Sequence, residues 1–285
     1  MKSLAEPFVS PSSRMQHKLG IIAGGGTLPR SLVHHCLETG RAYCLIALGG
    51  HAEIVHLKGV EFLHWSRIGA AGKIIDILKR EAVRDLVMVG PVKRPSLIAA
   101  MPDIRGLKFL LRAGRRAFGG DNSILSAIAG ELEAEGFRVI GIDSLLKELL
   151  TPPGVLTFTT PTDDVEKSIQ VGLEEARKLG SQDIGQAVVI EGVNILARET
   201  RGGTNDLIRR ASGLARKKRN LILVKAKKPG QDRRIDLPTM GLETVQLAAE
   251  NGFSGIAIEA GHSLFVDKER AIAAADAANL FILGI

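Results

Sequence analysis

Short apolar runs alternate with amphipathic stretches along the first half of the chain. LGIIA (residues 19–23) predicts a buried strand that enters a glycine turn, and the helix after it would end at Gly40. AYCLIALGG (42–50) and DLVMVGPV (85–92) predict further strands, and GKIIDILKREAV (72–83) predicts the helix between them. This alternation is typical of a parallel sheet with helical crossovers. Residues 19–150 are therefore predicted to form a Rossmann-like α/β domain.

The pattern changes at residues 151–162, which are rich in proline and threonine and have no helical period. We interpret this segment as a linker. Thr162 is then placed to cap a helix, and QAVVIEGVNILARET (186–200) predicts a hairpin that turns at Gly192–Asn194. Strands and helices alternate from there to the C-terminus, so residues 163–285 are predicted to form a second α/β domain.

Composition narrows the class of protein. The chain has 285 residues and a net charge of +7, which suits anionic partners such as nucleic acid, acidic lipid or phosphorylated substrates. Aromatic residues make up 4% of the chain, so stacking platforms for single-stranded nucleic acid are not evident. Cys36 and Cys44 are predicted to be buried free thiols in a reducing compartment.

The N-terminus and the hydropathy pattern give no sign of membrane insertion or export. No uncharged apolar run reaches the length that a transmembrane helix needs. Residues 1–18 lack the apolar core of a secretory signal, and we interpret them as a disordered leader. The basic run ARKKRN (215–220) is either a solvated helix end or a contact for an anionic partner.

Two glycine-rich turns could bind an anionic ligand. GGGTLP, Gly24 to Pro29, follows a strand and opens a helix, where backbone N–H groups and the helix dipole can receive a phosphate. It departs from the dinucleotide fingerprint because Pro29 takes the place of the third glycine, and a tight turn without a ligand is the alternative. In GGDNSIL, either Asp121 or Asn122 could cap a helix, and the alternative is that Asp121 contacts a sugar hydroxyl or a cation.

The segment KKPGQDRRIDLPTMG (227–241) concentrates opposite charges in a loop stiffened by proline. Its carboxylates, Asp232 and Asp236, would either bind a hard cation through oxygen or pair with Arg233 and Arg234. Upstream of it, RETRGGTNDLIRR (198–210) opens a helix and predicts an anion site or a cap. His262 follows a glycine at the end of a predicted strand, where sites of α/β proteins lie.

These motifs taken together resemble those of a known family. LGIIAGGGTLP, PDIRGLKFL, GDNSIL, LLTPPGVLT, GGTNDLIRRA, LVKAKKPGQDRRIDLPTMGLETV and IAIEAGHSLFVD occur in the order found in the LpxI family of UDP-2,3-diacylglucosamine pyrophosphatases. The resemblance covers residues 19–285. It implies a metal-dependent hydrolase of lipid A synthesis, in which water attacks the α-phosphorus and releases UMP and 2,3-diacylglucosamine 1-phosphate (lipid X).

The resemblance also implies roles for particular residues, most of them in the C-terminal domain. The catalytic residues would be Asp232, Asp236 and Arg233, and the ligands of Mg²⁺ (or Mn²⁺) would be Asp232, Asp236 and Asp206. The chain differs from the expected family pattern at Asn122 and Asn205, where acids are usual. The expected substrate-binding residues are Gly24, Gly25, Gly26, Thr27, Asp121, Asn122, Gln186, Thr204, Lys225, Lys228, Gln231 and Arg234.

The implied substrate is a lipid, which points to work at a membrane surface. We expect a cytoplasmic protein, peripheral at the inner face of the inner membrane, with Arg216 to Arg219 near anionic lipid. We expect no nucleic-acid partner, and a homodimer is possible. The alternative is a nucleotide- or nucleic-acid-binding regulator without hydrolase activity that uses the basic run, whose binding would fall steeply with salt. A transferase or dehydrogenase of nucleotide sugars is a further alternative.

Overall fold

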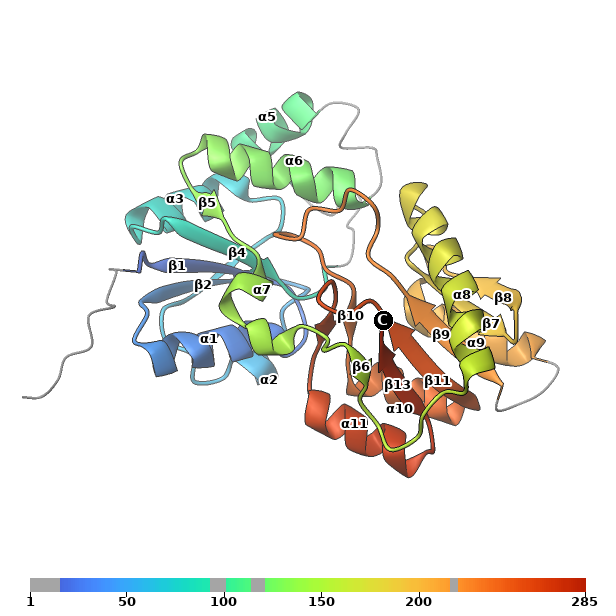
Figure 1. Cartoon of the computed structure of the whole chain (residues 1–285). Coiled ribbons are helices and arrows are strands. Elements are labelled where there is room, and N and C mark those ends of the chain that lie inside the picture. The colour runs from blue at the N-terminus through green and yellow to red at the C-terminus, as the bar shows by residue number, and fades with distance from the viewer. Residues whose placement is uncertain (1–15, 93–100, 114–120, 216–219) are drawn as a thin grey trace, which may run out of the picture.

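The chain forms two α/β domains that lie side by side (Figure 1). The structure is a computed structural model, and it describes residues 16–92, 101–113, 121–215 and 220–285. Most of the expected leader and the basic residues 216–219 lie outside the described residues. Within the described ranges, no helix is both long and apolar enough to cross a membrane.

The N-terminal domain has a parallel five-stranded sheet, as the sequence predicts. Its strands are β1 (Leu19–Ala23), β2 (Tyr43–Leu48), β3 (Leu63–Ser66), β4 (Asp85–Val89) and β5 (Arg138–Val139). They lie in the order β3-β2-β1-β4-β5, so the strand order reverses at β1, between its neighbours β2 and β4. Ligands of open parallel sheets bind where the order reverses, outside the carboxyl ends of the strands. The glycine turn after β1 occupies this place.

Helices cover both faces of this sheet, which explains why its strands read as continuous apolar runs. On one face lie α1 (Leu28–Thr39), α2 (Ile54–Leu57) and α7 (Ile142–Leu145), followed by the 3₁₀ turn η2 (Lys147–Leu149). On the other face lie α3 (Ala71–Arg80) and α6 (Asp121–Ala134), with α5 (Ile104–Ala113) outside them (Figure 1). Gly40 ends α1 with φ of 66°, the left-handed cap expected of it.

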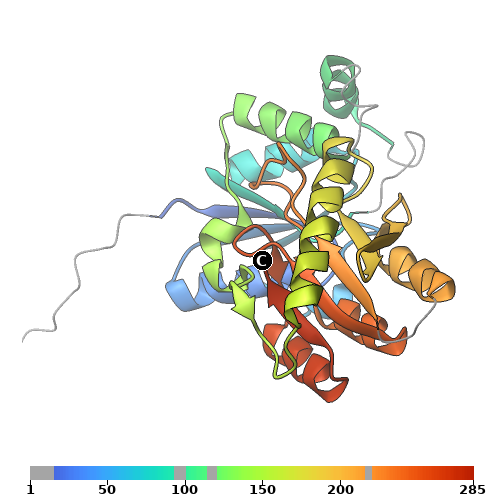
Figure 2. The ribbon, with the colours of Figure 1, turned by 45° about the vertical axis from the view of Figure 1, so that its right-hand side comes forward.

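The C-terminal domain has a mixed six-stranded sheet in the order β6-β13-β11-β9-β7-β8. Strands β9 (Leu221–Lys225), β11 (Phe253–Ile258) and β13 (Phe281–Gly284) are parallel. The predicted hairpin is confirmed as the antiparallel pair β7 (Ala187–Glu191) and β8 (Asn194–Arg198). Helix α8 (Asp163–Ser181) packs on one face, and α9 (Gly203–Leu214), α10 (Leu242–Glu250) and α11 (Lys268–Ala277) pack on the other (Figure 2).

The expected linker, residues 151–162, runs along the C-terminal domain. Its strand β6 (Gly154–Val155) pairs antiparallel with β13. Thr151 is buried, and its Oγ1 accepts a hydrogen bond of 2.8 Å from the hydroxyl of Ser263. The Pro- and Thr-rich segment thus extends the C-terminal sheet by one edge strand, which its composition alone did not indicate.

The two domains meet at a loop that leaves β9 and returns at β10 (Thr239–Met240), which we name the cross-domain loop (residues 226–238). Strand β10 pairs with β12 (Leu264–Phe265) beside it. Leu237 and Leu264 are buried in the core of the N-terminal domain, together with side chains of β1 and α1. The loop rich in opposite charges therefore also carries apolar contacts between the domains.

Candidate active site

The glycine turn after β1 interlocks with the turn after β4. The N–H groups of Gly24 and Gly25 donate to the carbonyl oxygens of Val89 and Pro91 at 2.8 and 2.9 Å. A Cβ on Gly24 would lie 2.6 Å from the oxygens of Gly90 and Pro91, so only glycine fits this approach. The close packing of two turns therefore explains part of the glycine motif without a ligand.

The end of the glycine turn is the part that faces an anionic group. The N–H of Gly26 lies 3.4 Å from Oε2 of Glu53, and Thr27 makes no side-chain cap to α1. The carboxylate of Glu53 thus lies at the N-terminal end of α1, where the helix dipole favours negative charge. A phosphate of a ligand would meet the same N–H.

The cross-domain loop is held to the N-terminal domain by its two arginines. Arg233 donates to Oδ2 of Asp143 in α7 at 3.0 Å, and its other contacts are Nδ1 of His262 and the carbonyl of Gly261. Arg234 pairs with Glu133 of α6, which covers the face of the N-terminal sheet opposite to α7. Both arginines therefore already neutralise carboxylates of the neighbouring domain.

The carboxylate of Asp232 is engaged within the loop. It accepts hydrogen bonds from the Nε, NH2 and backbone N–H of Arg234, the shortest at 2.7 Å. The guanidinium of Arg234 lowers the pKa of Asp232, so its carboxylate is ionised at neutral pH. This is the ion pair that the sequence offered as the alternative to cation binding.

Lys225, the last residue of β9, is the centre of a buried polar cluster beside the loop. Only 6% of Lys225 is exposed, and its Nζ donates to Oγ1 of Thr204 at 3.2 Å and to the carbonyl of Thr239 at 2.9 Å. Thr204 in turn donates to Oε1 of Glu199 at 2.7 Å. The other oxygen of Glu199 accepts the N–H of Gln186 at 2.7 Å. We name these four residues, Gln186, Glu199, Thr204 and Lys225, the lysine cluster.

Burial sets the electrostatics of the lysine cluster. Loss of water lowers the pKa of Lys225, and the carboxylates of Glu199 and Asp236 oppose that shift. Asp236 also accepts a hydrogen bond from the side-chain amide of Gln231, which is 4% exposed. Oε1 of Gln186 is buried without a hydrogen-bond partner, so the cluster has an unused acceptor. Such a cluster can hold an anionic group or a donor of a ligand.

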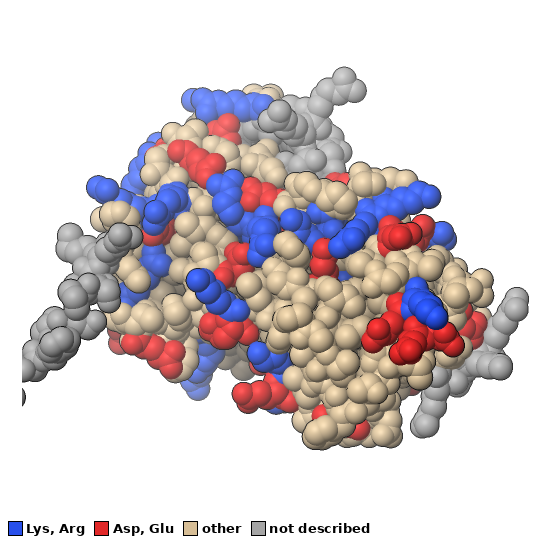
Figure 3. All heavy atoms as spheres, viewed as in Figure 1, with Lys and Arg blue, Asp and Glu red and all other residues tan. Residues whose placement is uncertain are grey.

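Lys and Arg side chains gather together with acidic ones where the two domains meet on the face shown in Figure 3. In the cross-domain loop, Lys228 donates to Oδ1 of Asp183 at 2.7 Å. Its backbone N–H donates to the side-chain oxygen of Gln231 at 3.1 Å. The loop is therefore tied to both domains by charged or polar side chains.

Both domains of the chain match known protein domains. A family model of the LpxI N-terminal domain matches residues 18–149, and a model of the LpxI C-terminal domain matches residues 152–283. The chain is 41% identical over 277 residues to the UDP-2,3-diacylglucosamine pyrophosphatase LpxI of Caulobacter vibrioides, covering 94% of this chain and 97% of that protein.

The chain belongs to the LpxI family. Both domains are covered, and the boundary between the two family models falls at the start of the expected linker. This confirms the resemblance found in the motifs, as well as the division into two α/β domains.

Solved structures add only weak likenesses. N5-carboxyaminoimidazole synthase from Aspergillus clavatus aligns over 70% of this chain and 44% of its own, with 11% identity and a TM-score of 0.25. Glycinamide-RNase-transformylase T from Mycobacterium tuberculosis aligns over 64% of this chain and 44% of its own, with 14% identity and a TM-score of 0.24. The chain thus spans less than half of either protein, and likenesses this weak indicate nothing about its function.

Of the three metal ligands that the LpxI resemblance implies, two lie close together along the chain and one lies apart from them. Asp232 and Asp236 lie in one turn of the cross-domain loop, because the N–H groups of Ile235 and Asp236 both donate to the carbonyl of Asp232. Their carboxylates are the hard oxygen donors that Mg²⁺ prefers. Asp206 instead pairs with Arg210 on α9 at 2.7 Å, and 43% of its side chain is exposed. Asp232 and Asp236 remain the predicted ligands, and the geometry does not bring Asp206 to them.

The remaining expected residues of this LpxI member divide between the two domains. Gly24 to Thr27 lie at the N-terminal switch point, whereas Gln186, Thr204 and Lys225 meet in the lysine cluster. Asp121 and Asn122 open α6, and their side chains lie outside the described part of the structure. Asn205, where an acid was expected, donates to Glu243 of α10 at 2.9 Å.

The sequence did not predict which acids bind Thr204, Arg233 and Arg234. Glu199 was visible beside the Gly-Gly pair, but its burial at 7% exposure depends on tertiary packing. Glu133 and Asp143 stand 101 and 90 residues from their arginines, and each reads as an ordinary helix residue. The signal that could have found Glu199 is its place between a strand end and a glycine-opened helix, next to the motif threonine.

Proposed function

We propose that the protein is a UDP-2,3-diacylglucosamine pyrophosphatase that acts in lipid A synthesis. The observation that carries this proposal is the 41% identity to the Caulobacter vibrioides enzyme of that name, over nearly the full length of both chains. The expected substrate-binding residues lie in both domains, which supports the proposal. A substrate with a nucleotide, a sugar and two acyl chains needs more surface than one turn provides.

The proposed reaction is hydrolysis of the pyrophosphate at the α-phosphorus. The oxygen of water forms a bond to the α-phosphorus while the bond from that phosphorus to the bridging oxygen breaks. UMP leaves with the new oxygen, and 2,3-diacylglucosamine 1-phosphate keeps the bridging oxygen. Charge develops on the phosphoryl oxygens, so the protein's task is mainly to position groups and to neutralise charge.

Lys225 and the cross-domain loop suit this task. The Lys225 ammonium is fixed by Thr204 and Thr239 in a place without bulk water, where a positive charge acts more strongly on a phosphate than it would at the surface. Arg233 and Arg234 are proposed to face the pyrophosphate, which would compete with Asp143 and Glu133 for their guanidinium groups. Substrate would therefore loosen contacts between the domains as it binds.

The proposed cofactor is Mg²⁺ (or Mn²⁺), held by Asp232 and Asp236. It would supply further neutralisation of the pyrophosphate. Burial lowers the pKa of Lys225 and the carboxylate of Asp236 opposes that shift, so the two side chains interact electrostatically. A cation bound at Asp236 and the side chain of Lys225 would therefore both act on the same pyrophosphate. The Asp232 carboxylate would exchange part of its contact with Arg234 for the cation.

A lipid substrate implies contact with a lipid surface, which we propose to involve α5. Ile104, Leu107 and Leu111 follow helical spacing along α5, and they are 78%, 51% and 74% exposed. The helix contains arginine and lysine but no acid. An exposed apolar stripe with basic flanks is typical of helices that lie at an anionic membrane surface. The protein would then be cytoplasmic and peripheral at the inner membrane.

Vesicle sedimentation tests the lipid contact. We expect the protein to sediment with vesicles of an anionic and a neutral phospholipid, less so at high salt, and Leu107→Gln combined with Leu111→Gln to weaken binding. Leu37, which is 64% exposed on α1, offers the matched control Leu37→Gln. Equal sedimentation of both variants with the unaltered protein would exclude α5 as the contact.

Product analysis tests the hydrolase. Purified protein is mixed with UDP-2,3-diacylglucosamine and Mg²⁺, with and without EDTA, beside Asp232→Asn and the control Asp164→Asn, whose side chain is 94% exposed. We expect UMP and lipid X from the unaltered protein and the control, and neither product with EDTA or from Asp232→Asn. Turnover that resists EDTA would overturn the proposed cofactor. Absence of turnover in every sample would leave the nucleotide-binding regulator as the better hypothesis.

A further inference from the structure

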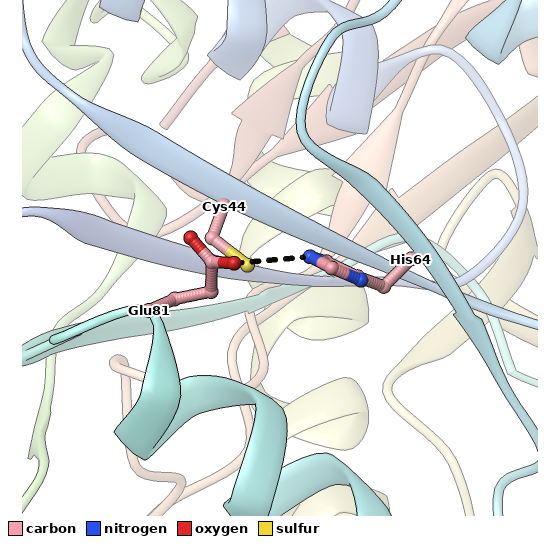
Figure 4. A group of neighbouring side chains, drawn as sticks. All are labelled: Cys44, His64 and Glu81. Atoms are coloured by element: carbon pink, nitrogen blue, oxygen red, sulfur yellow. Dashed lines mark ion pairs between the residues drawn. The ribbon is translucent and has the colours of Figure 1, made fainter.

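Cys44, His64 and Glu81 converge at the edge of the N-terminal sheet opposite the glycine turn (Figure 4). Cys44 is the second residue of β2, His64 is the second residue of β3, and Glu81 directly follows α3. Because the strands are parallel, the beginnings of β2 and β3 lie together, away from their carboxyl ends. This group is therefore separate from the lysine cluster and the cross-domain loop.

The potential ligand atoms of the three side chains lie close to one another. The sulfur of Cys44, one ring nitrogen of His64 and one oxygen of Glu81 all lie within 4.8 Å of one another, and His64 Nε2 is 3.5 Å from Glu81 Oε1. Ligand atoms around a tetrahedral Zn²⁺, at about 2.0–2.3 Å from the metal, stand roughly 3.3–3.8 Å apart. Small rotations of these side chains are enough to reach that spacing.

The donor set selects the class of metal. A thiolate sulfur, an imidazole nitrogen and a carboxylate oxygen are the protein ligands that Zn²⁺ accepts, whereas Mg²⁺ and Ca²⁺ take oxygen. Cys44 is fully buried, and the side chains of His64 and Glu81 are 35% and 26% exposed. Solvent would thus reach a bound metal from the side of His64 and Glu81, and a water molecule there could complete its coordination.

The surroundings hold the carboxylate ready and keep the thiol protonated. Lys18 donates to Oε2 of Glu81 at 2.6 Å and lowers the pKa of Glu81, while Oε1 faces His64. Burial and the charge of Glu81 raise the pKa of Cys44 to about 11, against a smaller opposite effect of Lys18. A bound metal must therefore displace the thiol proton, as metals do at cysteine sites. A second partner on a ligand carboxylate fixes its orientation.

We propose that Cys44, His64 and Glu81 form a binding site for a thiophilic divalent cation of the zinc class. The cation joins β2, β3 and the end of α3 at one point, so its binding stabilises the N-terminal domain. The site is independent of the hydrolysis proposed above and takes no part in it.

Cobalt substitution tests the site directly. Co²⁺ bound to a thiolate gives an intense charge-transfer absorption in the near ultraviolet, which Co²⁺ on oxygen ligands alone does not give. The full chain, stripped of metal, is titrated with Co²⁺ and then with Zn²⁺ in competition. We expect the thiolate absorption to saturate at one Co²⁺ per chain and to disappear as Zn²⁺ is added. We also expect Zn²⁺ to raise the thermal unfolding midpoint.

Matched variants locate the site. Cys36→Ser is the control, because Cys36 is also fully buried, its pKa is also raised to about 11, and it belongs to no metal-binding group among the described residues. Cys44→Ser should abolish the absorption, and His64→Gln should weaken Co²⁺ binding at least tenfold. Since the His64 side chain is partly exposed, its variant is expected to keep the fold, and near-ultraviolet circular dichroism checks this.

Three outcomes would overturn the proposal. They are the absence of thiolate absorption in the unaltered protein, equal absorption in Cys44→Ser, and a Zn²⁺-induced rise of the unfolding midpoint in His64→Gln that equals the rise in the unaltered protein at the same Zn²⁺ concentration. Asp232→Asn separates this site from the proposed Mg²⁺ site, since it should keep the cobalt absorption whether or not it hydrolyses the lipid.

Discussion

Among single residues of the candidate site, Lys225 is a basic side chain that is buried away from water. Its side-chain amine is buried at the end of a strand and hydrogen-bonds to the Thr204 hydroxyl and the Thr239 carbonyl. Burial lowers the pKa of Lys225, and the carboxylates of Glu199 and Asp236 oppose that shift. Buried lysines without such partners tend to lose their proton. These contacts indicate a residue that acts through its amine rather than through packing.

Replacement of Lys225 tests that interpretation. Lys225→Met keeps most of the side-chain volume but removes the charge, so we expect kcat/KM for the lipid substrate to fall by roughly 100-fold, the effect of losing one preorganised group that stabilises transition-state charge. Lys178→Met, at an exposed position in the last turn of α8, should leave the rate unchanged. Steady-state kinetics of both variants decide the matter, and equal rates would remove Lys225 from the site.

The pair of Asp232 and Arg234 predicts a pH dependence of stability. Because Arg234 lowers the folded-state pKa of Asp232 below its ordinary value of 3.8, the stabilisation is present above pH 3.8 and is lost as the pH falls through the lowered pKa. Arg234→Met removes the ion pairs with both Asp232 and Glu133, so it should cost about 0.4–2 kcal/mol at neutral pH, the sum for two partly exposed pairs. Urea unfolding should show that difference shrinking well below pH 3.8. A difference that stays constant with pH would mean that the arginine acts through packing alone.

At the scale of elements, the two interlocked glycine turns determine how β1 and β4 end. Gly90 has φ of 86°, and a Cβ there would lie 2.3 Å from the carbonyl oxygen of Gly25. Both the backbone conformation and the space exclude any larger residue. Backbone contacts between the two turns therefore shape the switch point of the sheet.

Alanine substitution tests the interlock. We expect Gly90→Ala to lower the free energy of unfolding by about 1–3 kcal/mol or more, because it combines left-handed strain with a clash. Gly130→Ala is the matched control within α6, where a Cβ meets nothing within 4 Å. It should be neutral or stabilising by up to about 1 kcal/mol, since alanine favours helix. Chemical denaturation measures both, and similar values for both would contradict the interlock.

Long elements could be predicted from the sequence, and short ones could not. β1, β2, β4 and the hairpin of β7 and β8 have apolar runs long enough to be distinguished, and the structure confirms them. β10 and β12 have two residues each and show no periodicity, so only their packing defines them. The same limit applies to the site: the motif residues were visible, but Glu133 and Asp143 lie far along the chain and meet their partners only through the tertiary fold.

At the scale of the whole molecule, the cross-domain loop couples the domains through pairs that a ligand phosphate could replace. Asp143→Asn combined with Glu133→Gln would remove both N-terminal partners and leave the loop's own residues intact. We expect a loss of stability of about 0.4–2 kcal/mol, the sum for two partly exposed pairs. We also expect faster hydrogen–deuterium exchange of residues 226–238, because the loop loses anchors.

Asp76→Asn provides the control for this double variant. Asp76 pairs with Arg105 inside the N-terminal domain, and 64% of its side chain is exposed. It should leave exchange in the loop unchanged. If the double variant also exchanged like the unaltered protein, the apolar contacts alone would hold the loop in place.

Leu237 and Leu264 have a consequence for how the chain folds during synthesis. Both leucines belong to the core of the N-terminal domain, yet they are made only after the first 236 residues of the 285 have left the ribosome's catalytic centre. Domains of multidomain proteins usually fold as units, the N-terminal one first. Here the N-terminal domain lacks part of its own interior until the C-terminal half is almost complete. Its newly made form therefore exposes an apolar gap for much of translation, and the last quarter of the chain closes it.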